Sequence, residues 1–378
     1  LEGANEAEAN VTLTSNKSVF SVVLADDSWL SYTISGTIVT FKAKSKNTTG
    51  NIRTTIATIT AGTGAAAKAV EVTVNQNVAA EGDASLELST NTVTITPDAV
   101  AKSEVITMIS DETEFAINIT DESWVKAYVD VTSKTLYFWT LSPNLNSSSR
   151  VTTATVIAGN GANAPKQEVT ITQRGLLSSE FAVGQVIADN GSLKGGIVFW
   201  VDATNRGKAK IMSLDRENLA WSTAGSPAST GVTLSNDDGL ANTTALAALP
   251  NAAEMPALKY CMDKGSGWYW PTRSDLEQMF ETYNGTKVAD ATEDNPNAIT
   301  DFEKANRAAW DLIVTNVGGT AMNTAAASST GDSYWASRET SSGTNAFYVR
   351  FGKPPAWDKA NGKKSGARYI RAVRSISK

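Results

Sequence analysis

The first half of the chain repeats itself, and this repeat limits the architectures that the chain can adopt. Residues 19–30, VFSVVLADDSWL, match residues 114–125, EFAINITDESWV, without a gap. After a loop that differs in length by two residues, residues 51–76 match residues 148–173. Two consecutive copies of one module therefore cover most of residues 11–174.

Each copy alternates apolar and polar residues with a period of two, as Phe20, Val22 and Leu24 do in the first copy. Short alternating segments separated by turns rich in Gly, Asn and Asp are typical of a β-sandwich. Trp29 and Trp124 each follow such a segment, so we expect both rings to lie in a core rather than to stack on a sugar.

The two copies differ at their beginnings. The second copy opens with a strand-like segment, residues 85–96, whose counterpart in the first copy would lie before residue 1. The sequence thus predicts that the first module lacks its opening strand. The plainer interpretation is that the chain was cut just inside the module. The alternative is a free sheet edge that another chain fills.

Several motifs occur in both copies: Ser28-Trp29-Leu30 and Ser123-Trp124-Val125, an arginine before a long strand (Arg53 and Arg150), and a closing strand that ends in glutamine. These motifs resemble the BACON family of immunoglobulin-like modules, which is common in surface and secreted proteins of gut Bacteroidetes. The resemblance implies two all-β immunoglobulin-like sandwiches, at residues 1–79 and 82–174. The family is often described as carbohydrate-binding, but no exposed aromatic platform recurs in the two copies.

Composition excludes several classes of function. The chain has no histidine, which excludes Ser-His-Asp and Cys-His catalysis and every His-ligated metal site. The single cysteine, Cys261, allows no internal disulfide, and its apolar surroundings predict a buried thiol. The net charge is −6 without a basic stripe, so nucleic acid is not an expected partner. No apolar run is long enough to span a bilayer. We expect no cofactor, and a membrane contact only through an anchor upstream of residue 1.

The second half has a different pattern, after a linker at residues 175–179. Strands are expected at residues 195–202 and 210–214, and helices at residues 243–264 (interrupted by two prolines), 274–283 and 301–314. The last helix would place apolar residues on one face: Phe302, Ala305, Ala309, Leu312 and Ile313. This mixture predicts an α+β domain rather than a third sandwich.

Three motifs in this half occur in a characteristic order: WYWPT at residues 268–272, YWASRE at residues 334–339 and RAVR at residues 371–374. Together they resemble the C-type-lectin-like domains at the C-termini of many bacterial surface proteins. The resemblance covers about residues 182–376 and implies a C-type-lectin-like domain at residues 178–378. Relatives include target proteins of diversity-generating retroelements, in which the segment matching residues 334–374 is varied to change the ligand.

That resemblance divides the C-terminal segment into a scaffold and a displayed set. The scaffold residues would be Trp335, Ser337, Ala346, Val349 and Phe351. The predicted ligand-binding residues, on display, are Arg338, Thr340, Asn345, Phe347, Arg350, Trp357 and Asp358. Trp357 lies in a loop without periodicity, where it would either stack on a ligand or cover its own loop. Trp221 is a weaker candidate of the same kind.

Two chemistries of that fold family lack their residues here. Its sugar-binding members hold calcium through Glu-Pro-Asn and Trp-Asn-Asp motifs, and neither is present. The nearest segment, Asn295-Pro296-Asn297, is expected to be a solvated turn rather than a metal site. The formylglycine-generating enzymes that share the fold need a pair of cysteines, which Cys261 alone does not supply.

The sequence therefore predicts a multidomain, non-enzymatic recognition protein. It would be an extracellular adhesin at a bacterial cell surface, held as an outer-membrane lipoprotein, with a host or microbial surface glycan or protein as its partner. One alternative is an accessory protein of carbohydrate-active enzymes or a glycoside hydrolase with a carboxylate pair. Asp121-Glu122 and Asp237-Asp238 are the acidic pairs considered for it. Another alternative is a structural module of a surface fibre.

Overall fold

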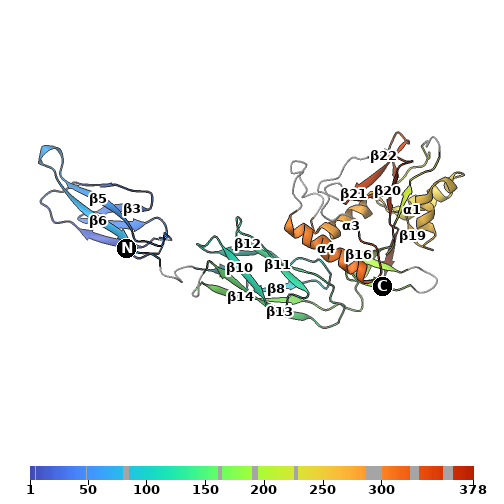
Figure 1. Ribbon diagram of the computed structural model, residues 1–378, viewed down its shortest axis with the longest axis horizontal. Helices are drawn as coiled ribbons and strands as arrows, with labels where there is room; N and C mark the ends of the chain where they lie inside the picture. Colours follow the sequence, from blue (N-terminus) through green and yellow to red (C-terminus); the bar gives the residue numbers. More distant parts are fainter. Residues whose placement is uncertain are drawn as a thin grey trace. The chain divides into compact units, whose positions relative to one another are not determined.

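The structure analysed is a computed structural model of the chain (Figure 1). It describes residues 1–4, 6–47, 49–79, 85–160, 164–189, 195–224, 229–286, 300–323, 332–351 and 361–378. The chain divides into two compact units. The first contains Leu1–Leu88, Met108–Ala116 and Val156–Gln167, and the second contains Ser89–Thr107, Ile117–Thr155 and Glu168–Lys378.

The N-terminal strands form two three-stranded sheets, as the period-two alternation predicts. One has the order β2 (Phe20–Leu24), β5 (Arg53–Ala61), β6 (Lys68–Gln76), and the other has the order β1 (Glu8–Thr12), β4 (Ile38–Ala43), β3 (Leu30–Ser35). A short 3-10 helix, η1 (Gly64–Ala66), lies in the loop of the β5–β6 hairpin. The ring of Trp29 is buried in the core of this sandwich, as predicted.

The second copy of the repeat forms two four-stranded sheets. One has the order β10 (Phe115–Ile119), β13 (Arg150–Ala158), β14 (Lys166–Gln173), β8 (Thr92–Ile95), and the other has the order β11 (Val125–Asp130), β12 (Thr135–Thr140), β9 (Ile106–Ile109), β7 (Glu87–Leu88). Trp124 is buried here, like Trp29 in the first copy. The prediction of consecutive β-sandwiches in the first half of the chain is therefore confirmed.

The motif residues shared by the two copies build the same polar cluster twice. Arg53 Nε donates to Gln76 Oε1 at 2.7 Å, and its guanidinium lies 4.8 Å from the centre of a Trp29 ring. Arg150 and Gln173 repeat the hydrogen bond at 2.7 Å. Gln173 is fully buried, and its amide also donates to the carbonyl of Asp98 at 2.9 Å. The arginine and glutamine of the motif therefore form buried hydrogen bonds that hold the ends of the strands together.

Replacing Gln173 by methionine is expected to lower the free energy of unfolding by about 2–3 kcal/mol. Methionine has a similar volume but leaves Arg150 Nε and the Asp98 carbonyl without this buried partner. Urea denaturation measures the loss. Gln167→Met, an exposed change on the same strand, is the control, and an equal loss in both variants would contradict the interpretation.

The rest of the chain combines strands with α-helices. One sheet has the order β15 (Val186–Ile187), β16 (Gly196–Val201), β17 (Lys208–Met212), β24 (Val373–Ser377), β19 (Trp268–Tyr269). The other has the order β18 (Glu217–Ala220), β23 (Ala367–Ile370), β20 (Ser333–Glu339), β21 (Asn345–Arg350), β22 (Asn361–Lys363). The α-helices are α1 (Gly239–Ala247), α2 (Pro256–Met262), α3 (Arg273–Asn284) and α4 (Asp301–Asn316), with a 3-10 helix, η2 (Ala252–Glu254), before α2. The predicted β16–β17 hairpin is confirmed.

The two longest α-helices, α3 and α4, each begin with a capping box. Thr272 and Asp275 form a capping box at the start of α3, and Thr300 and Glu303 form another at the start of α4. Cys261 is buried, so the prediction of a buried thiol is confirmed, and burial raises the pKa of this thiol. Among the described residues, none of the helices is long and apolar enough to cross a membrane.

The predicted apolar face of α4 is partly wrong. Leu312 is 59% exposed, and Ala305 is exposed as well. The buried face instead includes Asn306 and Arg307, whose side chains bond to the end of α3. Asn306 donates to the carbonyl of Tyr283 at 3.0 Å, and Arg307 Nε donates to Asn284 Oδ1 at 2.8 Å. Polar residues lie inward because they satisfy the backbone and side-chain groups where α3 ends.

The RAVR motif, at residues 371–374, begins between two strands and ends inside the second. β23 ends at Ile370 and β24 begins at Val373, so the two strands belong to different sheets. Arg371 lies between them, fully buried, and donates to the carbonyls of Ser213 at 2.7 Å and Leu214 at 3.1 Å. The Arg371 guanidinium thus supplies hydrogen bonds to carbonyl groups at the point where the chain passes from one sheet to the other.

Within the second unit, Phe302 at the start of α4 packs against aromatic residues of the second sandwich. Its ring centre lies 5.2 Å from that of Trp139 and 5.5 Å from that of Tyr137, both edge to face. Lys102 Nζ lies 4.1 Å from the Phe302 ring centre. A second tie is the ion pair between Arg206 and Asp98, at 2.7 Å. These contacts bury an aromatic cluster at the junction.

Candidate functional site

The predicted recognition segment is a hairpin of two strands, β20 and β21, in the C-terminal sheet (Figure 1). Its turn is closed by a hydrogen bond from the amide of Thr340 to the carbonyl of Asn345, at 2.9 Å. Gly343 in the turn has a φ of 68°, in the left-handed region that glycine adopts without strain. A backbone hydrogen bond and a glycine in the left-handed region therefore shape the turn.

The five predicted scaffold residues are buried, as expected: Trp335, Ser337, Ala346, Val349 and Phe351. Trp335 Nε1 donates to the carbonyl of Leu219 at 3.1 Å, which ties β20 to β18. Ser337 Oγ accepts a hydrogen bond from Asn242 Nδ2 at 2.8 Å, which ties β20 to α1. The hairpin is thereby held against elements that are distant in the sequence.

The predicted ligand-binding residues that the structure describes are all half-buried: Arg338, Thr340, Asn345, Phe347 and Arg350. Arg338 donates to Asn236 Oδ1 at 2.6 Å, and its guanidinium lies 5.7 Å from the Phe347 ring centre. Thr340 and Asn345 meet at the turn. The predicted sites Trp357 and Asp358, and the Asn295-Pro296-Asn297 segment, lie outside the described residues.

These residues do not gather on one face of the sheet. Phe347 and Arg350 are three positions apart on β21, so their side chains point to opposite faces. Arg338 lies with Phe347, whereas Arg350 Nη2 donates to the hydroxyl of Tyr348 at 3.0 Å. The hairpin therefore offers two separate polar and aromatic groups, one on each face.

Arg350 belongs to a cluster of cations and aromatic rings that the sequence analysis missed. The Arg368 guanidinium lies 3.7 Å from the Tyr348 ring centre and 4.8 Å from that of Trp335. Burial lowers the pKa of Arg368, and the neighbouring Arg350 adds to this effect. A Cβ atom on Gly362 would approach the Arg368 guanidinium to 2.4 Å, so a larger residue at this position would displace the end of that side chain. Two adjacent guanidinium groups favour an anionic or planar ligand group.

Beneath the hairpin turn lies a buried ion pair between Glu339 and Lys364, which the sequence analysis also missed. Glu339 additionally accepts hydrogen bonds from the amide of Thr230 at 3.0 Å and from the hydroxyl of Ser229 at 2.9 Å. Burial alone would raise the pKa of Glu339, but the hydrogen bonds from Lys364 and Thr230 outweigh it and lower the pKa. The carboxylate thus joins β20, the chain after β22 and the loop at Thr230.

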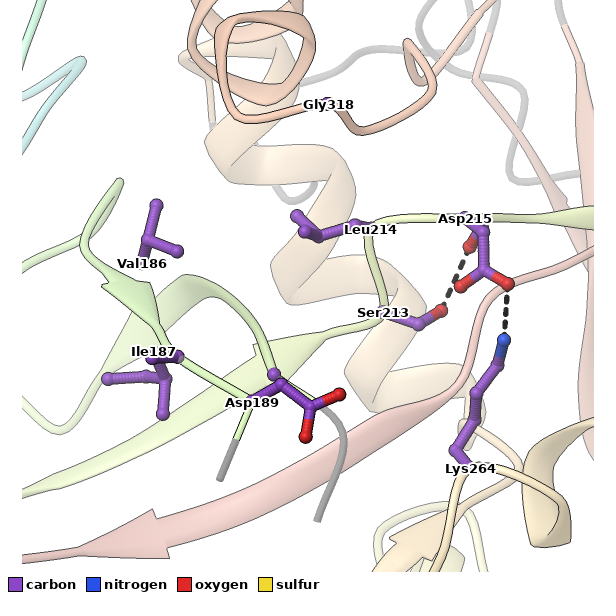
Figure 2. Close-up of a pocket in the computed structure, with 10 residues that line it drawn as sticks. Val186, Ile187, Asp189, Ser213, Leu214, Asp215, Lys264 and Gly318 are labelled. Carbon is purple, nitrogen blue, oxygen red and sulfur yellow. Dashed lines mark hydrogen bonds and ion pairs between the residues drawn. The ribbon is translucent and has the colours of Figure 1, made fainter. Parts of the chain in front are cut away.

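A separate pocket of about 400 Å³ opens in the same part of the chain (Figure 2). Lys264 reaches in to form an ion pair with Asp215, and Ser213 Oγ donates to the carbonyl of Asp215 at 2.9 Å. The lining residues are Val186, Ile187, Ala188, Asp189, Gly195, Ser213, Leu214, Asp215, Lys264 and Gly318. This lining shares no residue with the predicted binding set.

Trp221, the weaker ligand-stacking candidate, is corrected by the structure. Its side chain is fully buried, and Nε1 donates to the carbonyl of Ala336 at 3.1 Å. The ring packs against Trp270 with a centre-to-centre distance of 4.9 Å. It supports β20 from below and is closed to ligands, because a single-sequence pattern does not distinguish a buried loop tryptophan from an exposed one.

The acidic pairs considered for hydrolysis have structural roles. Asp121 accepts a hydrogen bond from the amide of Ser123 at 2.9 Å, and hydrogen bonds from Ser123 lower the pKa of Asp121. Glu122 pairs with Lys126. Asp238 caps α1, and Asp237 accepts a hydrogen bond from Ser274. Within the described ranges, no three Asp, Glu or Cys residues converge as a metal site would require.

Among the carboxyl groups that the structure describes, that of Asp311 has a raised pKa. Burial raises the pKa of Asp311, on α4, to about 6, against a hydrogen bond from the amide of Met322 at 2.7 Å. Between pH 3.8 and 6 the folded state keeps a proton that the unfolded chain has released, so stability falls as the pH rises through this window. Above it, the buried carboxylate destabilises the fold by about 3 kcal/mol.

Replacing Asp311 by asparagine is therefore expected to raise the free energy of unfolding by about 1–3 kcal/mol at pH 7.5 and to leave it nearly unchanged at pH 4. Asparagine keeps an oxygen for the Met322 amide and removes the charge. Urea denaturation at the two pH values measures the effect. Asp301→Asn, an exposed change on the same helix, is the control. An equal effect at both pH values would contradict the raised pKa.

Comparisons with known proteins identify no family for this chain. No protein-family model and no curated protein sequence matches it. Among solved structures, the human desmocollin-1 ectodomain has 10% identity and a TM-score of 0.27, over 50% of this chain and 41% of that chain. An endo-fucoidan hydrolase of glycoside hydrolase family 107 has 11% identity and a TM-score of 0.26, over 47% of this chain and 28% of that chain. Likenesses this weak carry no argument about function.

Proposed function

We propose that this protein is an extracellular recognition protein of a bacterial cell surface, either secreted or anchored. Two BACON-type immunoglobulin-like modules, at residues 1–79 and 82–174, would serve as the stalk. A C-type-lectin-like head at residues 178–378 would bind a host or microbial glycan or protein. One observation carries the proposal: the β20–β21 hairpin presents half-buried polar and aromatic side chains over a scaffold that is fully buried.

The contrast between the two sets of residues supports recognition rather than a purely structural role. Half-buried arginines lie on aromatic rings along this hairpin. Here Arg338 lies over Phe347, and Arg350 and Arg368 lie over Tyr348. Partly buried arginine and aromatic side chains are the residue types that dominate binding energies at interfaces.

The buried network around Glu339 holds the backbone of the β20–β21 hairpin in one position. Glu339 and Lys364 hold the hairpin against the Thr230 loop, so the surface residues start from a fixed backbone. A binding surface on a rigid support loses less conformational entropy when a ligand binds. The support and the displayed residues are separate, so the displayed residues can change without loss of the fold.

The Arg350–Arg368 cluster favours a ligand that carries a carboxylate, sulfate or phosphate group. Guanidinium groups bind such anions with paired hydrogen bonds. An acidic glycan or an acidic protein surface would supply the anion.

A binding screen of the full chain against acidic and neutral glycans and host surface proteins tests the proposal. The screen compares the wild type with Arg338→Ala and Arg350→Ala. We expect a specific ligand whose affinity falls at least tenfold in one of the two variants. Arg273→Ala, on the surface of α3, is the matched control and should bind normally. Equal binding by all four proteins would place the site elsewhere and contradict the proposal.

The glycoside-hydrolase alternative has less support. Its candidate acids lie in turns and caps, and Asp311, the carboxyl group with a raised pKa, bonds to Met322 and lies close to the Tyr283 hydroxyl, at 3.5 Å. Asp311 does not line the pocket in Figure 2. We therefore propose a non-enzymatic function, which hydrolysis of any captured glycan by the purified chain would contradict.

A further inference from the structure

A β-bulge in β16 places two consecutive aromatic side chains on the same side of the sheet. The pairing of β16 with β17 matches Val198 with Ile211 and Trp200 with Lys210, so Phe199 is an extra residue in the ladder. Side chains alternate between the two faces of a regular strand, and a bulge interrupts this alternation. Phe199 belongs to the hydrophobic cluster that contains the buried face of α3, and Trp200 packs against the same cluster. The bulge thus turns the Trp200 ring toward α3.

A side chain of α3 holds the bulge in place. Thr282 Oγ1 donates to the carbonyl of Phe199 at 2.7 Å, and so supplies a partner for the residue that the strand pairing leaves out. The Phe199 side chain is fully buried, whereas that of Trp200 is only half-buried. Bulges often lie beside functional sites, where they redirect a side chain. Here the redirected side chain is a large aromatic ring that keeps part of its surface accessible.

Trp200 lines a pocket of about 280 Å³ within the second unit. Residues 99–101 and Val183 supply an aliphatic wall, and the C-terminal half of α3 supplies a polar wall. The lining residues are Asp98, Ala99, Val100, Ala101, Val183, Trp200, Gln278, Glu281, Thr282, Gly285 and Thr286. This volume is close to the lower limit of the range of about 300–1,000 Å³ that small-molecule sites occupy, so the pocket suits a ligand of a single ring.

Hydrogen bonds hold the aliphatic wall in a fixed shape. Val100 has a φ of 51°, in the left-handed region that β-branched residues avoid. Its amide donates to the carbonyl of Thr140 at 2.9 Å, and the amide of Ala101 donates to Thr140 Oγ1 at 3.1 Å. In the first sandwich, Glu6 has a φ of 59°, and its amide donates to the carbonyl of Ala43 at 3.1 Å. The two copies therefore share this loop shape, and the copy that carries the pocket has an apolar residue there.

The polar wall offers both donors and acceptors of hydrogen bonds. In the described part of the chain, no group accepts a hydrogen bond from Trp200 Nε1, which reaches solvent. Gln278 Oε1 accepts a hydrogen bond from Lys210 Nζ at 2.9 Å. Because an ammonium group only donates, the amide oxygen of Gln278 faces Lys210, and Nε2 has no acceptor among the described residues. The Glu281 carboxylate and the Thr282 hydroxyl oxygen supply acceptors.

The charges around the pocket favour an uncharged ligand. None of the described residues that line the pocket is a lysine or an arginine. Asp98 forms an ion pair with Arg206 at 2.7 Å, and Glu281 also has a partner within the chain. An anionic ligand would therefore meet carboxylates without a cation, and a cationic ligand would compete with existing partners. This lining is the opposite of the Arg350–Arg368 cluster of the hairpin.

We propose that this pocket binds one pyranose ring of a neutral saccharide, which packs on Trp200 and forms hydrogen bonds with Gln278 and Glu281. A pyranose presents C–H groups on its faces and hydroxyl groups around its edge. The C–H groups match the indole ring and the aliphatic wall, and the hydroxyl groups both donate and accept. This proposal is independent of the ligand that the β20–β21 hairpin binds.

The test follows Trp200 directly by fluorine NMR. The full chain, labelled with 5-fluorotryptophan, is titrated with the methyl glycosides of glucose, galactose and mannose. The Trp200 resonance is the one that Trp200→Phe lacks among the ten tryptophans. We expect at least one neutral pyranoside to shift this resonance saturably and to leave that of Trp124, in the core of the second sandwich, in place. If none of the three shifts the Trp200 resonance, the proposal is overturned.

Variants locate the site. Gln278→Ala should weaken binding of the same pyranoside about tenfold, because it removes a hydrogen-bond donor from the surface of α3. Trp200→Ala should abolish binding in a saturation-transfer measurement on the ligand. Tyr32→Ala removes a ring that is 37% exposed in the first unit, and it should bind normally. If Trp200→Ala does not fold, Gln278→Ala still decides the question, and wild-type binding by Gln278→Ala would overturn the proposal.

The matching uronates test the role of charge. Each should bind at least about tenfold more weakly than its neutral pyranoside, because its carboxylate would lie beside Asp98 and Glu281. Arg350→Ala should bind the neutral pyranoside as the wild type does, since Arg350 belongs to the hairpin. Uronates that bind as tightly, or a loss of neutral binding in Arg350→Ala, would place the saccharide elsewhere and overturn the assignment to this pocket.

Discussion

Replacing Glu339 by alanine is expected to lower the free energy of unfolding by about 3–5 kcal/mol, because it breaks a buried ion pair on one side only. The Glu339 side chain is 8% exposed and that of Lys364 is 1% exposed. The change removes the carboxylate that binds the Lys364 ammonium group and the amide of Thr230. The hairpin turn would lose its link to both neighbouring segments.

Urea denaturation measures this loss, and a double-mutant cycle with Lys364→Met assigns it to the pair. Asp263→Ala removes one partner of an exposed ion pair, Lys259–Asp263, and should change stability by less than about 0.5 kcal/mol. Because the pKa of Glu339 is lowered in the fold, its contribution is present above pH 4.5 and declines at lower pH. A loss no larger than that of Asp263→Ala would contradict the role assigned to the network.

The second large effect is expected from Phe302→Ala, which should lower the free energy of unfolding by about 3–5 kcal/mol. The ring is buried against Trp139, Tyr137 and Lys102 within the second unit. Truncation leaves a cavity between α4 and the second sandwich. We expect the melting transition of α4 and its neighbours to separate from that of the sandwich, since the aromatic contact that couples them is lost.

Differential scanning calorimetry resolves the two transitions. Leu312→Ala, an exposed change on the same helix, is the matched control and should leave the calorimetric profile nearly unchanged. A single transition at the wild-type temperature in Phe302→Ala would show that the aromatic cluster does not couple the two parts.

Local signals in the sequence predicted much of the architecture. The repeat indicated two sandwiches, because alternation with period two is a property of each strand by itself. The helices expected at residues 274–283 and 301–314 are α3 and α4, with ends that differ by at most two residues. The burial of the scaffold residues Trp335 and Ala346 was implied by the resemblance to C-type-lectin-like domains and not by alternation, because residues 334–337 of β20 are all buried.

Features that depend on distant partners were not predicted. Arg371 breaks a strand because carbonyls more than 150 residues earlier in the chain accept its hydrogen bonds. Arg307 turns inward on α4 because Asn284 lies opposite it. Glu339 is one of 39 acidic residues in the sequence, and nothing local connects it to Lys364 and Thr230. Such long-range polar contacts have no periodic signature.

The candidate site shows the same division. The sequence predicted which residues of the hairpin would be buried and which would lie toward the surface. It did not predict that Phe347 and Arg350 point to opposite faces, or that Arg368 joins Tyr348 beside Arg350. Phe347 and Arg350 point to opposite faces because they are three positions apart on one strand. The contact of Arg368 with Tyr348 depends instead on β23, a strand that lies further along the sequence.

Hydrogen exchange of the full chain with and without a ligand from the binding screen tests the central claim most directly. The account predicts slower exchange in the β20–β21 hairpin, at residues 338–350, with the same protection lost in Arg350→Ala or Arg338→Ala. Slower exchange confined to the pocket around Asp215 and Lys264, with the hairpin unchanged, would contradict the claim that the hairpin is the recognition surface.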